Sequence, residues 1–451
     1  MMKKNIIYAI TLASLSLGVA LPIHAQNKDD PIKSTITNAK DKKVFKSVCK
    51  KKMPDWQRQK QELKIVDFIG KTQKVIVAQG GTKSKNAPPV SILLDEDYHA
   101  HPTTVMLNDN KTILAVWNLG HGGNAGPIAK STDGGLTWER IDNVMPKAYQ
   151  LFRNCPSIYK ISDKNGKERI FVLTQKTQDK KGLSVTQKSE NYSGYMPRVM
   201  SEDNGKTWKL LPPLSSLDPK SPFACVMTFS SMIQLKDGST LGIFHKGDGK
   251  GRDRQLKLVQ SITHDGGLTW TEPQIILTPD DLGGLQPCEP FVFRSPDGNE
   301  LCCIIRENSR KNGTSLVMFS KDEGKTWSKP IDTPWALTGD RHNGLYLPDG
   351  RLIFTFRDMT QPKENDKLYF GCWIGTYDDI KNGKAGQYRV LLSETKLRKD
   401  KKWKRDGYYQ SMHLLPDNTI VAITYESIED FTSSSITCHR FKIEDIEKLA
   451  K

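Results

Sequence analysis

The side chains of this sequence that are best suited to chemistry are polar residues at the ends of short apolar hairpins. One hairpin reads "EPFVFRSPDGNELCCIIR" (289–306), with Asp297-Gly298 at its turn. Residues equidistant from such a turn face each other in an antiparallel pair. We therefore expect Glu289 to lie beside Arg306, which places a carboxylate that can accept a proton next to a guanidinium that can bind an anion.

The same symmetry applies to the other hairpins. It predicts three further pairs: Tyr409 with Glu426, Arg341 with Arg357, and His101 with Asn118. Arg153 stands just before another of the first strands. Several arginines in one place suit a carboxylate ligand, because the guanidinium fork binds both of its oxygens. The alternative is that these strand ends are polar only because they meet solvent.

Six apolar hairpins of this kind occur along the chain, and they must surround a common centre to bring these residues together. Their first strands begin at 101, 155, 229, 289, 341 and 410, about 62 residues apart, so two further strands fit into each interval. Four-stranded blades repeated radially form a β-propeller. We therefore predict an all-β fold, a six-bladed β-propeller of four-stranded antiparallel blades, over residues 89–451.

A repeated eight-residue turn supports the same architecture. It occurs as "STDGGLTW" (131–138), "SEDNGKTW" (201–208), "THDGGLTW" (263–270) and "SKDEGKTW" (320–327). The aspartate can accept hydrogen bonds from the backbone amides that follow, and the glycine adopts positive φ without strain. A unit of this size cannot bury its own surface, so four copies indicate stacked blades.

This turn resembles the Asp-box, and with the six-blade pattern the chain resembles the sialidase (neuraminidase) superfamily over roughly 90–440. The resemblance implies a tyrosine nucleophile, a glutamate that activates it, and three arginines that bind the substrate carboxylate. "YYQSMHLLPDNTIVAITYE" (408–426) is similar to the family's tyrosine segment, which implies that Tyr409 is the nucleophile and Glu289 its partner. The substrate-binding residues expected with them are Arg306, Arg357, Arg341, His101, Arg153 and Glu426.

Two segments depart from the family pattern. Where the family carries an arginine in its first blade, this chain reads "HAHPTT" (99–104), so His101 or Ala100 stands in its place. The family's acidic aspartate precedes the first Asp-box, but "NLGHGGNAGPIAK" (118–130) contains no carboxylate. His121 is the nearest group there that exchanges protons near neutral pH, and we take it as the third catalytic residue, although a plain turn residue is the alternative. Asp248 is a second choice for the acid.

These residues predict an exo-glycosidase that hydrolyses a terminal acidic sugar, such as sialic acid, from a glycoconjugate. Two alternatives stay open because of the missing aspartate: a lyase that cleaves uronic-acid glycans by β-elimination, and a glycan-binding propeller without catalysis. Nothing in the sequence calls for a cofactor or a catalytic metal. We expect an acidic glycan as the partner and a monomer as the working form.

The chain begins with features of a secretory signal peptide. Lys3 and Lys4 precede an apolar run that ends near Leu21, which predicts a signal peptide over 1–25, a lead-in segment over 26–88, and an exported protein, periplasmic or secreted. No later stretch reaches the length of a membrane helix. The net charge of +16 suits acidic glycans, and export argues against nucleic acid. Of the eight cysteines, Cys155, Cys225, Cys288 and Cys372 lie in or beside apolar runs, so we expect mostly buried thiols, with one or two disulfides as the alternative.

Overall fold

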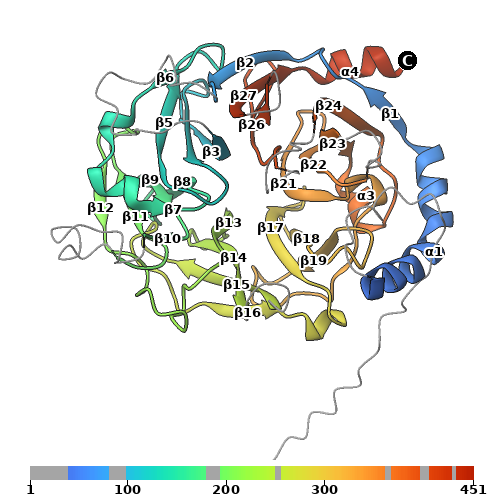
Figure 1. Cartoon of the computed structure of the whole chain (residues 1–451), viewed down its shortest axis with the longest axis horizontal. Coiled ribbons are helices and arrows are strands. Elements are labelled where there is room, and N and C mark those ends of the chain that lie inside the picture. The colour runs from blue at the N-terminus through green and yellow to red at the C-terminus, as the bar shows by residue number, and fades with distance from the viewer. Residues whose placement is uncertain are drawn as a thin grey trace, which may run out of the picture.

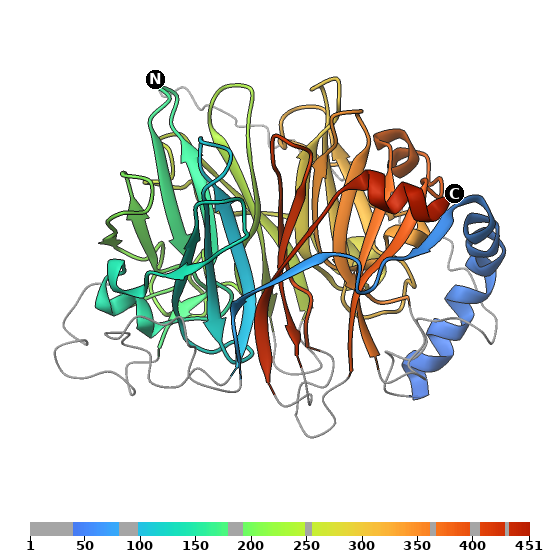
Figure 2. The same cartoon turned by 90° about the horizontal axis from the view of Figure 1, so that it is seen from above.

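The computed structural model of this chain is a ring of six β-sheets around a central axis (Figure 1). It describes residues 39–80, 98–178, 193–248, 255–360, 367–396, 406–428 and 433–451. The strands run roughly along the axis of the ring (Figure 2). The predicted six-bladed β-propeller of four-stranded blades is therefore confirmed. The expected signal peptide lies outside the described residues.

Each blade contributes one strand to the centre, and these strands contact one another in a closed ring. The innermost strands are β3 (His99–Met106), β8 (Ser157–Ser162), β13 (Met227–Gln234), β17 (Pro287–Arg294), β21 (Gly339–Tyr346) and β25 (Ser411–Leu414). The second strands are β4 (Ile113–Leu119), β9 (Glu168–Leu173), β14 (Thr240–Asp248), β18 (Leu301–Glu307), β22 (Leu352–Asp358) and β26 (Ile420–Ser427). The third strands are β5 (Ala125–Ser131), β11 (Arg198–Ser201), β15 (Gln255–Thr263), β19 (Leu316–Ser320), β23 (Lys367–Gly375) and β27 (Ser434–Phe441).

The outer strands and the connections complete the blades. The outer strands of the first five blades are β6 (Glu139–Arg140), β12 (Lys209–Leu211), β16 (Gln274–Leu277), β20 (Ile331–Asp332) and β24 (Tyr388–Lys396). A separate short pair joins β7 (Phe152–Arg153) to β10 (Lys176–Thr177). The helical connections are η2 (Asp142–Val144), η3 (Lys147–Leu151), η6 (Asp280–Leu282), η7 (Trp335–Leu337), α3 (Tyr377–Lys381) and α4 (Ile443–Ala450).

The N-terminal segment closes the ring. Strand β2 (Gln73–Ala78) pairs antiparallel with β27 and is the outer strand of the sixth blade, so this blade joins the two ends of the described chain. Strand β1 (Lys64–Asp67) adds a parallel fifth strand to β24. Helix α1 (Ala39–Glu62) packs Phe45 and Trp56 into the same apolar cluster as Trp335. The predicted lead-in segment thus contributes strands to two of the blades.

Apolar side chains fill the space between neighbouring blades. Between the first and second blades, Leu114 and Val116 of β4 pack with Ile158 of β8 and Val172 of β9, all of them buried. Because both faces of the middle strands are covered, β4 reads as a nearly continuous apolar run instead of alternating. Burying each such side chain stabilises the fold by about 1.5–3 kcal/mol. All eight cysteines are free and buried, as expected.

The four Asp-boxes connect the third and fourth strands of the first four blades. In the first of them, the Asp133 carboxylate accepts hydrogen bonds from the amides of Leu136 (3.0 Å) and Thr137 (2.9 Å). A Cβ added at Gly205, in the second copy, would lie 2.5 Å from Leu114 of the preceding blade. Each turn therefore fastens one blade to the one before it. Because a blade is antiparallel, these turns lie at the end of the ring opposite the starts of the innermost strands.

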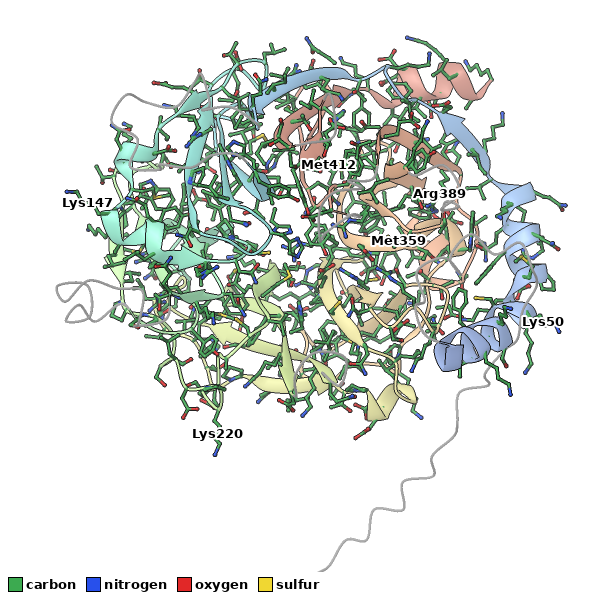
Figure 3. The ribbon with its side chains drawn as sticks, viewed as in Figure 1. Lys50, Lys147, Lys220, Met359, Arg389 and Met412 are labelled. Carbon is green, nitrogen blue, oxygen red and sulfur yellow. The ribbon has the colours of Figure 1, made fainter. Side chains whose placement is uncertain are left out.

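The outer surface carries much of the positive charge. Lys50, Lys147 and Lys220 project from the periphery of the ring, away from its axis (Figure 3). Among the helices of the described ranges, none combines the length and apolarity required to cross a bilayer.

Candidate active site

Backbone bulges aim three side chains at the axis of the ring. The pairing of the first and second strands shifts register at Ala100/Thr103, Cys288/Phe291 and Asp340/Asn343. Within these shifts His101 (φ 51°), Glu289 (φ 46°) and Arg341 (φ 53°) adopt the left-handed conformation that residues other than glycine rarely occupy. Such strained positions cluster at functional sites and re-aim side chains. A bulge with a left-handed residue therefore occurs at the same place in three blades and turns one side chain from each toward a common site.

The predicted nucleophile and base meet at this site. The Tyr409 hydroxyl donates a hydrogen bond to Glu289 Oε1 at 2.6 Å, across 120 residues of sequence. Arg306 Nη1 contacts both groups, at 2.6 Å from the phenol oxygen and 2.8 Å from Glu289 Oε1. Tyr409 and Glu289 are buried. The structure thus brings together three residues that the sequence assigned to the site.

The charges around these groups fix their resting protonation. Burial alone raises the pKa of the Glu289 carboxyl, but Arg306, Arg341 and the Tyr409 hydrogen bond outweigh it and hold the pKa below its ordinary value. Burial raises the pKa of Tyr409 well above its usual range, against the opposing effects of Arg306 and Arg357. The resting pair is therefore a neutral phenol beside a carboxylate that can accept its proton.

A second buried carboxylate, Asp340, forms ion pairs with three arginines. Arg306 Nε lies 3.1 Å and Arg357 Nη1 3.5 Å from its oxygens, both as ion pairs, and Arg310 Nη2 donates a hydrogen bond to Oδ1. Arg357 also lies over the Tyr409 ring, with its central carbon 4.4 Å from the ring centroid. Asp340 therefore holds the guanidinium groups in place around the nucleophile. Neither Asp340 nor Arg310 was selected from the sequence.

Asp406 forms a third buried centre, which the sequence analysis missed. Its oxygens accept hydrogen bonds from the Tyr98 and Tyr425 hydroxyls and from His121 Nδ1, the last at 2.9 Å. Burial alone raises the pKa of this carboxyl, but His121, His101 and Arg357 lower it below its ordinary value. The first blade lacks the expected aspartate, but the Asp406 carboxylate, from the segment before β25 of the sixth blade, lies against its His121. The position of Asp406 three residues before Tyr409 is the only signal that the sequence offers.

His101 lies between these centres. Its Nδ1 is 3.1 Å from Asn118 Oδ1, and its ring centroid is 5.2 Å from that of Tyr409. Burial lowers its pKa to about 3, so the imidazole is neutral at physiological pH. The ligating atoms of His101, His121 and Asp406 lie within 4.8 Å of one another, a spacing that could hold a cation. The Asp406 oxygens, however, already accept three hydrogen bonds and face Arg357 at 3.6 Å, which favours a hydrogen-bonded centre.

Two predicted substrate-binding residues lie elsewhere. Glu426 contacts the hydroxyl of Tyr408 (3.0 Å), His439 (3.0 Å) and Lys74 (3.0 Å), not Tyr409. The reason is that Tyr408 takes the left-handed conformation (φ 62°), which turns the two neighbouring tyrosines in different directions. Arg153 lies outside the contacts around Tyr409: it is in β7, which pairs with β10, and it bridges Asn124 beside the turn that carries His121.

Arg341 faces the central channel. With Ser230, Gln410 and Met412 (labelled in Figure 3) it lines a cavity of about 470 Å³ between the six innermost strands. Arg341 is buried, and among the described residues its Nη1 has no hydrogen-bond partner. Of the expected substrate-binding arginines, Arg357 is already ion-paired with Asp340 and Asp406, whereas Arg341 Nη1 still offers a donor.

Residues 169–369 match the BNR repeat-like domain family. The chain therefore contains a BNR repeat-like region within its six-bladed β-propeller. No curated protein sequence matches it. An α-L-arabinofuranosidase of Fusarium graminearum solved with arabinobiose has the same fold, with a TM-score of 0.55, 15% identity, and coverage of 84% of this chain and 100% of that one. A protein of unknown function from Dyadobacter fermentans has a TM-score of 0.52 at 17% identity, covering 81% of this chain and 98% of that one.

An intramolecular trans-sialidase of Ruminococcus gnavus gives a TM-score of 0.48 at 15% identity, covering 78% of this chain and 96% of that one. In this propeller, the tyrosine, the glutamate and the arginine that the sequence singled out lie together. The neutral His101 stands where the resemblance implied a first-blade arginine.

Proposed function

We propose that this sialidase-like propeller is an exo-glycosidase that releases a terminal acidic sugar through a covalent intermediate on Tyr409. The hydrogen bond of 2.6 Å from the Tyr409 hydroxyl to Glu289 carries the proposal. A phenol is unreactive until a base takes its proton, and Glu289 is placed and charged to do so. Arg306, which contacts both groups, stabilises the phenolate as it forms.

The reaction takes place in two steps. In the first, Tyr409 Oη bonds to the anomeric carbon, its proton passes to Glu289, and the bond from that carbon to the leaving oxygen breaks as this oxygen gains a proton. In the second, water attacks the same carbon, the bond to Tyr409 breaks, and the phenolate recovers its proton from Glu289. A tyrosine suits an acidic sugar, because a carboxylate nucleophile would be repelled by the carboxylate of the substrate.

The charge of the site supports an acidic sugar. Four arginines stand against three buried carboxylates, which leaves one positive charge in excess. The arginines are Arg306, Arg310, Arg341 and Arg357, and the carboxylates are Glu289, Asp340 and Asp406. A substrate carboxylate would offset this excess of positive charge, and Arg341 offers the buried donor to receive it.

A second candidate is a neutral sugar. Arg306 and Arg357 are already ion-paired with Asp340, as expected of a site whose substrate brings no carboxylate. The Fusarium graminearum structure with a similar fold is an α-L-arabinofuranosidase, which is a likeness of fold alone.

A third candidate is a lyase. β-Elimination from a uronic acid would use Tyr409 as the base, with Arg306 and Arg357 stabilising its phenolate.

A substrate panel tests the proposal. Purified wild-type protein and Tyr409→Phe are incubated with sialosides, α-L-arabinofuranosides and uronic-acid oligosaccharides, and the products are separated by chromatography. We expect free acidic sugar from the wild type and at least a 1,000-fold lower kcat/KM for Tyr409→Phe. Free arabinose alone supports the neutral-sugar candidate, an unsaturated product that absorbs in the ultraviolet supports the lyase, and binding without turnover contradicts all three.

A further inference from the structure

We propose that His121 is the group that protonates the leaving oxygen, and that Asp406 is the residue that positions it. The proposal rests on the glycosidase function above and names the proton donor which that reaction requires. It is based on the contact between His121 Nδ1 and Asp406 Oδ2 at 2.9 Å. This contact joins a turn of the first blade to the segment that precedes β25 of the sixth blade.

Asp406 itself is unsuited to donate a proton. Its side chain is 2% exposed, and its oxygens already accept hydrogen bonds from two phenols and one imidazole. Arg357 Nη2 lies 3.6 Å from Oδ1. A carboxylate in these surroundings stays ionised, because every neighbour stabilises its negative charge. Asp406 can therefore orient a partner but cannot reach a substrate.

His121 has the complementary properties. Its side chain is 33% exposed, so it can meet a substrate from which Asp406 is shielded. Because Nδ1 faces a carboxylate, we assign its proton to that bond, which leaves Nε2 as the atom that exchanges protons with the substrate. The arrangement is that of a partly exposed imidazole held in one tautomer by a buried acid.

The turn that carries His121 is shaped by glycine. Gly120 and Gly122 on either side both have φ 72°, and a Cβ at Gly123 would lie 1.7 Å from the carbonyl oxygen of Leu119. Only glycine fits such a turn. The sequence "LGHGG" (119–123), which looked like a loop without a carboxylate, thus folds tightly enough to set one imidazole over Asp406.

The acid also lies within reach of the nucleophile. The His101 ring centroid is 4.9 Å from that of His121 and 5.2 Å from that of Tyr409. The His121 and Tyr409 rings are therefore at most about 10 Å apart, a bound that includes the separation of about 5–5.5 Å between the catalytic groups of a retaining glycosidase. His101, which lies between them, is buried and neutral, so it adds no charge that would compete for the proton.

The proton balance closes with this assignment. The imidazolium Nε2–H of His121 gives its proton to the leaving oxygen as the bond to the anomeric carbon breaks. The neutral imidazole then removes a proton from the water that attacks the same carbon, which restores the imidazolium. The Tyr409 proton meanwhile passes to Glu289 and returns, so the two proton transfers use separate groups.

Leaving-group dependence tests the assignment. We compare wild type, His121→Asn and Tyr409→Phe on an alkyl glycoside and a dinitrophenyl glycoside of the same acidic sugar, since the dinitrophenolate leaves without a proton. For His121→Asn we expect kcat/KM to fall at least 100-fold on the alkyl glycoside and less than 10-fold on the dinitrophenyl glycoside. Tyr409→Phe should lose activity on both. The exposed His264, in an Asp-box at the other end of the ring, provides the control His264→Asn, which should match wild type.

Asp406→Asn tests the positioning role. It should move the pH profile of kcat/KM, while the dinitrophenyl glycoside is still turned over with a change of less than 10-fold. Among the described residues, the titratable groups that contact His121 include Asp406 and His101, and Tyr98, Tyr425 and Arg357 surround Asp406. Equal losses of His121→Asn on both substrates, or none, would overturn the assignment while leaving the glycosidase intact. No turnover by wild type would instead overturn the proposed function.

Discussion

Three buried histidines should make this protein lose stability in mild acid. Each is neutral in the fold and nearly inaccessible: His99 is 0%, His101 4% and His342 3% exposed. Burial lowers the pKa of His99 and His101 to about 3 and that of His342 to about 4. In the unfolded chain each recovers a pKa near 6.5. The unfolded state therefore binds more protons than the folded state between these values.

The sign and size of the effect follow from linkage. Stability is fully present above about pH 6.5 and falls as the pH drops toward the folded pKa, since protons then favour the unfolded chain. Between pH 7 and pH 5 each histidine costs about 2 kcal/mol, and three cost about 6 kcal/mol. His413, whose pKa burial lowers to about 4, adds about 2 kcal/mol more. The result depends little on the folded pKa values, as long as all four lie well below 5. Most carboxylates remain ionised in both states within this window.

Urea unfolding followed by tryptophan fluorescence at pH 7, 6 and 5 measures the effect. We expect the free energy of unfolding to fall by about 8 kcal/mol from pH 7 to pH 5 in the wild type, and by about 6 kcal/mol in His342→Gln. The exposed control His264→Asn should lose as much as the wild type. A free energy of unfolding that stays constant over this range would refute the reasoning that these imidazoles are held neutral.

Three further variants test other parts of the account. Asp340→Asn removes the counter-charge of buried arginines, so urea unfolding should show a loss of about 3–5 kcal/mol, and an unchanged midpoint would contradict the ion-pair assignment. Asp133→Ala breaks one Asp-box and should cost about 1–3 kcal/mol with kcat/KM unchanged, whereas a loss of activity would place that turn near the chemistry. Gly205→Ala should cost about 1–3 kcal/mol through strain against Leu114, and thermal unfolding at the wild-type temperature would rule that contact out.

The architecture could be predicted because its signals are local and repeated. Apolar hairpins and Asp-boxes each encode one turn, and their spacing sets the number of blades. Hairpin symmetry also predicted the contact between Glu289 and Arg306, which the structure contains. The predicted backbone register was wrong by one residue, because Cys288 and not Glu289 pairs with Arg306. The β-bulge that causes this shift cannot be recognised from the residue types.

The rest of the site depends on contacts between blades, which no spacing reveals. Asp406 and His121 are 285 residues apart and meet only when the ring closes. Hairpin symmetry placed Arg341 at the site but gave no role to its neighbour Asp340. In the structure this carboxylate forms ion pairs with Arg306 and Arg357. Tyr408 and Tyr409 are adjacent in sequence, and only the left-handed backbone at Tyr408 decides which of them meets Glu426.

The central claim is that Tyr409 forms a bond to the sugar, and trapping that bond tests it most directly. The protein is incubated with a fluorinated acidic glycosyl fluoride, whose second step is slow, then digested and analysed by mass spectrometry. The account predicts an adduct of one sugar on the peptide that contains Tyr409, and none in Tyr409→Phe. An adduct on Glu289, or hydrolysis of the probe by wild type with inverted configuration and no adduct, would contradict it.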